Sequence, residues 1–154
     1  MVISNLNTKL IQDRIGFIIG SVERLRDLAK LDREVFLAGD TPAIAESYLR
    51  RSLEAVFDIG RHIIAKHAGK ASVEYKEIAR LLGKKGVISK TLSENLTLMA
   101  GYRNRMVHFY HAVTDEELYE IVTDNLSDIE HFVKEMAAFL EAYTEAQKMR
   151  KPEV

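Results

Sequence analysis

The sequence predicts an all-α fold, an antiparallel up-and-down bundle of four long helices and one short helix. Only two prolines and eight glycines interrupt the 154 residues, so most of the chain is compatible with helix. Apolar side chains recur at steps of three and four residues, which is the period of an amphipathic helix, and no segment alternates as a strand does. We therefore expect a single helical domain over residues 1–154.

The first two predicted helices occupy most of the first half of the chain. Gly39 and Asp40 break the pattern between them. Thr41 then predicts an N-cap with Pro42 at the first helical position, and this second helix should run to about His67. The first helix, at residues ~6–31, is predicted by a stripe of apolar residues, namely Ile11, Ile15, Ile18, Val22, Leu25 and Ala29.

Three further helices are predicted in the second half. A short helix at ~73–82 precedes residues 83–86, which we expect to form a flexible basic loop. The next helix begins near Ser89. Thr114, with Glu117 three residues later, predicts a capping box and so the start of the last helix. That helix is predicted by apolar residues at helical spacing, which are Leu118, Val122, Ile129, Phe132, Met136, Phe139 and Tyr143.

The composition limits where the protein works and what it binds. The chain has no cysteine, which excludes disulfides and fits a reducing compartment. No apolar run approaches the ~18 residues of a membrane span, and the N-terminus has no basic segment followed by an apolar core. We expect a cytoplasmic protein that does not bind membranes. The formal net charge of −1 means that any nucleic-acid binding must depend on a local basic patch.

The most informative segment is residues 103–110, Arg-Asn-Arg-Met-Val-His-Phe-Tyr. On a wheel of ~100° per residue, Arg103 and Tyr110 lie on the same stripe as the apolar residues Leu92, Leu96, Met99 and Met106. Because an unpaired guanidinium is costly to bury, Arg103 must pair with a carboxylate of another helix, or face a cleft or a partner. His108 lies ~140° around the helix from Arg103, so their side chains would diverge, whereas Asn104 and His108 share a face.

The spacing Arg-x4-His-x-Tyr, with Asn104 directly after the arginine, resembles the motif of the HEPN superfamily in the form carried by HepT-type toxins. Residues 49–65 and 113–121 are also similar to this family, and the resemblance covers roughly residues 5–145. It implies a HEPN-like fold and an endoribonuclease toxin that forms a homodimer with two motifs converging at the interface. It also implies neutralisation by an MNT-type nucleotidyltransferase antitoxin, which can transfer AMP to Tyr110.

The residues of the motif suit RNA cleavage that needs no metal and no cofactor. RNA supplies its own nucleophile, the 2′-hydroxyl, so cleavage requires a base, an acid and positive charge on the phosphate. His108 fits the acid–base role because the ordinary pKa of histidine lies near neutrality. Arg103 can bind two phosphate oxygens, Asn104 can orient His108 or donate to the phosphate, and Tyr110 can stack on a base. We expect RNA, and not DNA, to be the substrate.

Other basic residues are candidates for RNA contact, with the alternative that they only face solvent. They are Arg105, the pair Arg50 and Arg51 together with Arg61, and the pair Lys84 and Lys85 together with Lys90. His108 and His111 are three apart, but no carboxylate or cysteine accompanies them at a spacing typical of metal sites, so we expect no metal.

A second hypothesis stays open beside the ribonuclease. The chain would then be a non-catalytic HEPN helical module that binds a nucleotide or a partner nucleotidyltransferase. A buried pair between Arg103 and a carboxylate, with no open cleft, would favour this module. The sequence has no Gly-Ser followed by Asp-x-Asp, so the chain is not itself the nucleotidyltransferase. It does not indicate whether mRNA or tRNA is the substrate.

Overall fold

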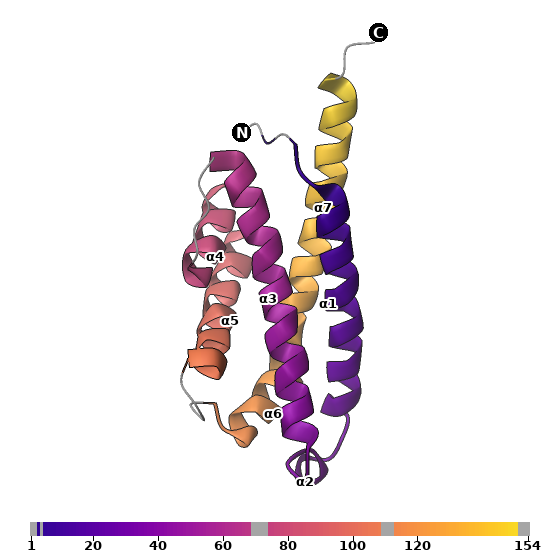
Figure 1. The fold of residues 1–154 in the computed structure, drawn as a ribbon, viewed down its shortest axis with the longest axis vertical. Helices are drawn as coiled ribbons and strands as arrows, with labels where there is room; N and C mark the ends of the chain where they lie inside the picture. Colours follow the sequence, from indigo (N-terminus) through magenta and orange to yellow (C-terminus); the bar gives the residue numbers. More distant parts are fainter. Residues whose placement is uncertain (1–2, 4, 69–73, 109–112, 151–154) are drawn as a thin grey trace.

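The computed structural model describes residues 3, 5–68, 74–108 and 113–150. Within these residues the chain is all-α and forms no strand (Figure 1). The seven helices of the described part are α1 (Thr8–Ala29), α2 (Arg33–Phe36), α3 (Thr41–Ala68), α4 (Tyr75–Lys84), α5 (Lys90–His108), α6 (Asp115–Asp124) and α7 (Leu126–Arg150).

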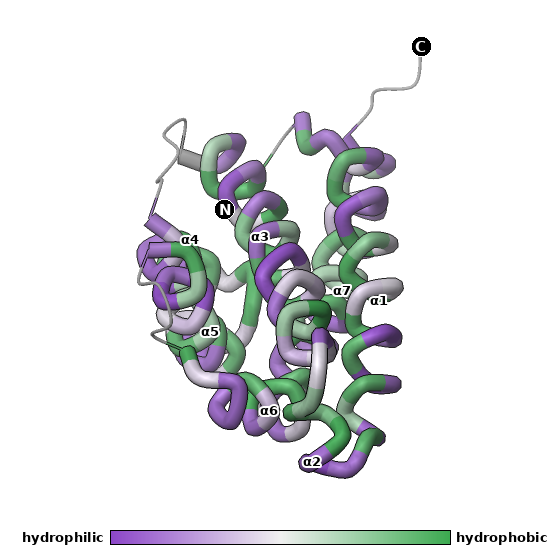
Figure 2. Tube along the Cα trace, turned by 60° about the horizontal axis from the view of Figure 1, so that its bottom comes forward, coloured by the Kyte–Doolittle hydropathy of each residue, from purple (hydrophilic) through white to green (hydrophobic). Residues whose placement is uncertain are grey.

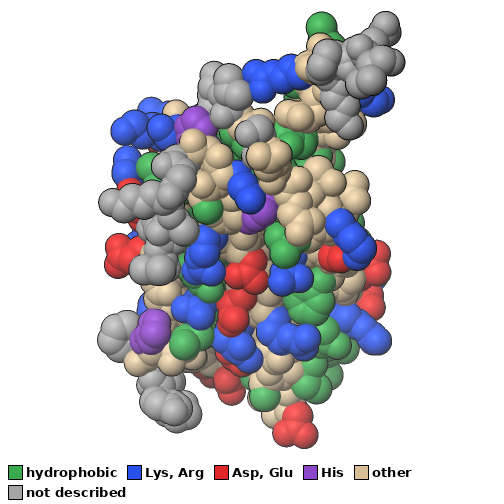
Figure 3. Space-filling model, turned by 45° about the horizontal axis from the view of Figure 1, so that its top comes forward, with side chains coloured by type: hydrophobic (Ala, Val, Ile, Leu, Met, Phe, Trp, Pro, Cys, Tyr) green, Lys and Arg blue, Asp and Glu red, His purple; other side chains and the backbone are tan. Residues whose placement is uncertain are grey.

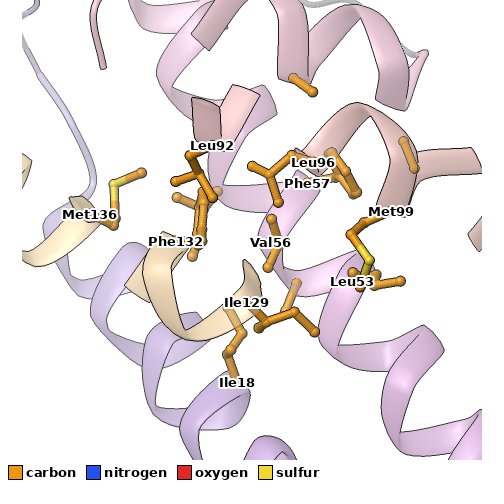
Figure 4. Packing of buried hydrophobic residues seen from close by; sticks show 14 of the residues in the cluster. Ile18, Leu53, Val56, Phe57, Leu92, Leu96, Met99, Ile129, Phe132 and Met136 are labelled. Carbon is orange, nitrogen blue, oxygen red and sulfur yellow. The ribbon is translucent and has the colours of Figure 1, made fainter. Parts of the chain in front are cut away.

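Helix α3 lies in the middle of the bundle. Helices α1 and α7 pack on one side of it and the α4–α5 hairpin packs on the other, while α2 and α6 cover one end (Figure 1). Hydrophilic and hydrophobic stretches alternate along the long helices, as expected of amphipathic helices (Figure 2). Figure 4 shows large side chains of the core, among them Ile18 of α1, Phe57 of α3, Leu96 of α5 and Phe132 of α7. None of the described helices combines the length and apolarity needed to span a membrane.

The prediction of four long helices and one short helix is wrong in its count. The last predicted helix is two helices, because the backbone leaves the helical path at Asn125 (φ −116°, ψ 1°). Helix α6 crosses the end of the bundle and α7 then runs along α1 (Figure 1). The break was hidden in the sequence because Leu126 is itself buried, so the apolar spacing continues from Val122 to Ile129 without interruption.

Helix α6 starts at the predicted Thr114 cap, but the carboxylate of Glu117 bonds to Arg105. The Oγ1 of Thr114 accepts a hydrogen bond from the N–H of Glu117 at 3.1 Å, which caps the helix. At the start of α3 the prediction is off by one residue. The carbonyl of Asp40, and not that of Thr41, accepts the first helical bond, from the N–H of Ile44 at 3.0 Å.

Two short segments also differ from the prediction. Helix α2 is a single turn that the sequence pattern did not predict, and it buries Phe36 against Tyr119 with 5.0 Å between ring centroids. Residues 83–86 are not all loop, because α4 continues through Lys84. The turn falls at Gly86, whose φ of +74° is a conformation that glycine adopts without strain.

Gly83 lies within α4, at a point where α4 and α5 pack closely. This close packing predicts that a larger residue at position 83 lowers the stability of the fold. An ideal Cβ on Gly83 would lie 2.5 Å from both the Cβ and the Oγ of Ser93. Since the Cβ of Ser93 is fixed to the backbone of α5, the helices must move apart. We expect Gly83→Ala to lower the free energy of unfolding by about 1–3 kcal/mol, measured by urea denaturation.

The control is Gly20→Ala on the exposed side of α1, where an added Cβ meets no atom within 4 Å. This substitution should raise the free energy of unfolding by about 0.5–1 kcal/mol, because alanine favours helix more than glycine does. Equal effects of the two substitutions would contradict the close packing at Gly83.

Candidate active site

A cleft of about 500 Å³ opens between α3, the first turn of α4 and the last turns of α5. Three residues of the motif reach it from α5. The complete lining among the described residues is Arg61, Glu74, Tyr75, Lys76, Arg103, Asn104 and His108. The chain therefore brings Arg103 and His108 to one cavity without a second copy.

Arg103 is held in the wall of this cleft by an aromatic ring. Its guanidinium carbon lies 4.4 Å from the centroid of the Tyr75 ring, and that ring stacks on Phe57 with 4.7 Å between centroids. The side chain of Arg103 is 18% exposed. The cation–π contact thus accommodates a guanidinium on an apolar stripe, and Arg103 lines the cleft.

The sequence left open that Arg103 pairs with a carboxylate of another helix, and the structure shows only a long ion pair of this kind. The Nε of Arg103 lies 4.0 Å from the Oε1 of Glu54, and this Nε is buried without a hydrogen-bond partner. The same Glu54 oxygen accepts a hydrogen bond from Arg50 at 3.1 Å. Glu54 therefore does not neutralise Arg103 fully, and the cleft beside it is open.

Asn104 lies between the other two motif residues. On the helix wheel it falls ~100° from Arg103, and His108 follows at ~140°. The Nη1 of Arg103 donates to the Oδ1 of Asn104 at 3.5 Å, and His108 is exposed at the last residue of α5. The expected divergence of Arg103 and His108 is overcome because the arginine is long and the cleft spans the sector that Asn104 occupies.

The cleft is electropositive although the whole chain is not. Arg61, Lys76 and Arg103 line it against the single carboxylate of Glu74, whereas the chain has a formal net charge of −1. Helix α4 begins at this wall, so the positive end of its dipole adds to the field. Such a surface attracts an anion such as a phosphate. The described residues contain no group of three His, Cys, Asp or Glu side chains that could hold a metal ion.

Among the further RNA-contact residues named from the sequence, Arg61 lines this cleft and the others do not. Arg105 donates two hydrogen bonds to the carboxylate of Glu117, at 2.7 and 2.9 Å. That contact raises the pKa of Arg105, chiefly through the hydrogen bonds. Arg50 lies between Glu46 and Glu54, at 3.1 Å from each. These two arginines therefore form ion pairs with carboxylates of their own chain.

The remaining candidates lie away from the cleft. Arg51 stacks over Phe17 of α1, 5.0 Å from the ring centroid. Lys84 and Lys85 lie at the far end of α4, because Gly83 packs on Ser93 near the start of α5. On the face seen in Figure 3, Lys and Arg side chains (blue) are mixed with Asp and Glu side chains (red) and form no continuous basic surface. RNA contact by these residues stays a prediction.

Sequence reasoning missed three residues of the cleft, Glu74, Tyr75 and Lys76, and placed Arg61 in the wrong group. Tyr75 and Lys76 begin α4, and no pattern in the sequence linked them to the motif. Arg61 had been grouped with Arg50 and Arg51, but its position on α3 brings it to Tyr75 instead. Tyr110 lies outside the described residues.

The buried part of the apolar stripe of α5 is not free to form a dimer interface. Leu92, Leu96 and Met99 are buried in the core of their own chain, with exposures of 2%, 0% and 0%. They pack beside residues of α3 and α7 (Figure 4). The homodimer therefore stays a prediction that depends on the resemblance to HEPN proteins alone.

Comparison with known proteins gives consistent results. The family model described as "Ribonuclease HepT-like" matches residues 18–136. The chain is 22% identical over 139 residues to the "tRNA nuclease HepT" of Aphanizomenon flos-aquae, which covers 89% of this chain and 94% of that protein. It is 32% identical over 85 residues to the "mRNA nuclease HepT" of Shewanella oneidensis, covering 55% of this chain and 64% of that one.

A solved structure extends the similarity to three dimensions. It is the tri-AMPylated Shewanella oneidensis HEPN toxin in complex with MNT antitoxin. The match has a TM-score of 0.76 at 25% identity and covers 84% of this chain and 97% of that one. This similarity confirms the predicted HEPN-like fold.

Proposed function

We propose that this chain, which belongs to the HepT-like ribonuclease family, is an RNA-cleaving toxin that uses Arg103 and His108 at the cleft between α3, α4 and α5. The observation that carries the proposal is the convergence of Arg103, Asn104 and His108 on one open, electropositive cleft. The names of the related nucleases supply the substrate class, RNA.

In the proposed reaction the 2′-oxygen of RNA attacks the adjacent phosphorus and the 5′-oxygen leaves. The O2′–P bond forms, the P–O5′ bond breaks, and the first product ends in a 2′,3′-cyclic phosphate. The 2′-hydroxyl loses a proton and the leaving 5′-oxygen gains one. His108, exposed at the end of α5, carries one of these transfers. In the proposed homodimer the His108 of a second copy would carry the other.

Arg103 and Asn104 act on the phosphate in this proposal. The ring of Tyr75 fixes the guanidinium of Arg103, which limits its motion before substrate arrives. As charge develops on the phosphate oxygens, the guanidinium donates to them. Since the Oδ1 of Asn104 faces Arg103, its amide N–H groups are the part that can donate to the substrate. Metal independence follows from this set of groups and is part of the proposal.

The proposal includes the partner. Because a HEPN toxin with a similar fold occurs in complex with MNT antitoxin in a tri-AMPylated state, we infer that a nucleotidyltransferase of this type also neutralises the present chain. Transfer of AMP to Tyr110 is the mechanism we propose. The relatives include a tRNA nuclease and an mRNA nuclease, so the RNA class is an outcome of the experiment.

The alternative, a non-catalytic nucleotide- or partner-binding module, is less well supported. This alternative would be favoured by a buried ion pair between Arg103 and a carboxylate and by the absence of an open cleft. The closest carboxylate oxygen, on Glu54, lies 4.0 Å from Arg103, and the cleft is open.

The experiment that tests the proposal is analysis of cleavage products. Purified chain incubated with tRNA and with mRNA should give products ending in 2′,3′-cyclic phosphate, read by mass spectrometry. Cleavage should be equally fast with a metal chelator present, because His108 and Arg103 need no ion. Products ending in a 3′-hydroxyl, or loss of cleavage with the chelator, would contradict the mechanism.

A further inference from the structure

A second arginine lies against the ring that holds Arg103. The guanidinium carbon of Arg61, on α3, is 5.6 Å from the centroid of Tyr75, whereas that of Arg103 is 4.4 Å from it. Because both distances end at one ring centroid, the two guanidinium carbons are no more than 10 Å apart. Tyr75 thus contacts two guanidinium groups, and both arginines line one cleft.

Arg61 is only partly neutralised by the protein. Its Nη1 lies 3.4 Å from the Oδ1 of Asp58, and the other oxygen of Asp58 lies 3.7 Å from the Nε of Arg14. One carboxylate is therefore shared by two arginines. This contrasts with Arg105, which has the whole carboxylate of Glu117.

Arg61 also has a buried donor without a partner. Its Nε is buried and makes no hydrogen bond. Among the described residues, the other guanidinium nitrogen that is buried without a partner is the Nε of Arg103. A buried donor that is left unpaired costs free energy, so the protein does not fully satisfy the hydrogen-bonding groups of either arginine. Both such arginines line the same cavity.

We propose that Arg61 is a second phosphate-binding residue, which takes the phosphate next to the scissile one while Arg103 takes the scissile phosphate. The inference rests on the proposed function, since it assumes that the ligand is an RNA strand. Consecutive phosphates of one strand match two neighbouring guanidinium groups, and a positive groove that follows the backbone is how single strands are held without regard to sequence. Lys76 lies along α5 beside Gly101 and extends the same wall.

The test is the salt dependence of RNA binding. In a His108→Ala background, which keeps the RNA intact, a fluorescent single-stranded oligoribonucleotide is titrated at several salt concentrations. Each phosphate contact contributes about 0.7 to the slope of log Kd against log salt for a single strand. We expect Arg61→Gln to reduce that slope by about 0.7, and Arg61→Lys to retain it.

The control is Arg24→Gln, which removes an exposed arginine from α1, on the other side of α3. It should leave the slope unchanged. Thermal unfolding of each variant shows whether the fold is retained. A purely structural role for Arg61, through Asp58 and Tyr75, would lower stability and leave the slope as it was, and that result would overturn the inference.

The outcome is separable from that of the proposed function. A chain that binds RNA with the expected loss of slope but never cleaves RNA supports the role of Arg61 and rejects the ribonuclease. A chain that cleaves RNA while Arg61→Gln keeps the full slope rejects the role of Arg61 alone. No measurable binding of the oligoribonucleotide rejects the inference.

Discussion

His108→Ala is expected to lower kcat/KM for RNA cleavage by about 100- to 10,000-fold, because it removes the proposed acid–base group. His108 is exposed at the end of α5, so the fold should be retained. Cleavage of an oligoribonucleotide is measured in solution, and growth is followed after induced expression without an antitoxin. The wild type should arrest growth and the variant should not.

His131→Ala is the matched control, since it removes another exposed histidine, from α7. It should cleave RNA and arrest growth as the wild type does. If His108→Ala stays fully toxic with a normal unfolding curve, His108 is not the acid–base group. Arg103→Ala should also be inactive, but it is a weaker test, because Arg103 packs on Tyr75 and its loss also removes packing.

How far the sequence predicted the site depends on whether its residues are near in the chain. Arg103, Asn104 and His108 belong to one helix, and the resemblance of their spacing to the HEPN motif named them as candidates. Tyr75 belongs to another helix, and a cation–π contact leaves no periodic trace in the sequence. The position of Arg105 could not be predicted either. It follows Asn104 directly, but its direction on the helix brings it to Glu117 of α6.

The errors in the fold have a similar cause. Periodicity reports which residues are buried, and not where the backbone turns. Leu126 is buried on both the predicted and the observed path, so the pattern is the same for one helix and for two. In contrast, Thr114 was correctly predicted as a cap, because its hydrogen bond to the N–H of Glu117 is local. The cap at Thr114 depends on local chemistry, whereas the crossing of α6 depends on the packing of the whole bundle.

Addition of AMP to Tyr110 is expected to block cleavage. Tyr110 follows His108 by two residues in the sequence. An adenylyl group on its phenol adds bulk and one phosphate charge close to the motif. That phosphate would compete with RNA for the guanidinium of Arg103, which receives the substrate phosphate in our proposal. In the modified chain, the phosphate of the added AMP would occupy the place of the RNA phosphate at Arg103.

Intact mass spectrometry of the chain co-expressed with its nucleotidyltransferase measures this modification. We expect a series of species separated by the mass of one adenylyl group, since the related HEPN toxin is tri-AMPylated. Tyr110→Phe should lose every added group, because it lacks the phenol oxygen that would bond to the phosphorus. Tyr102→Phe, a control in the same helix that carries the motif, should be modified as the wild type is. An unmodified mass in a complex that no longer cleaves RNA would show that the antitoxin acts by covering the cleft, and the charge competition at Arg103 would be rejected.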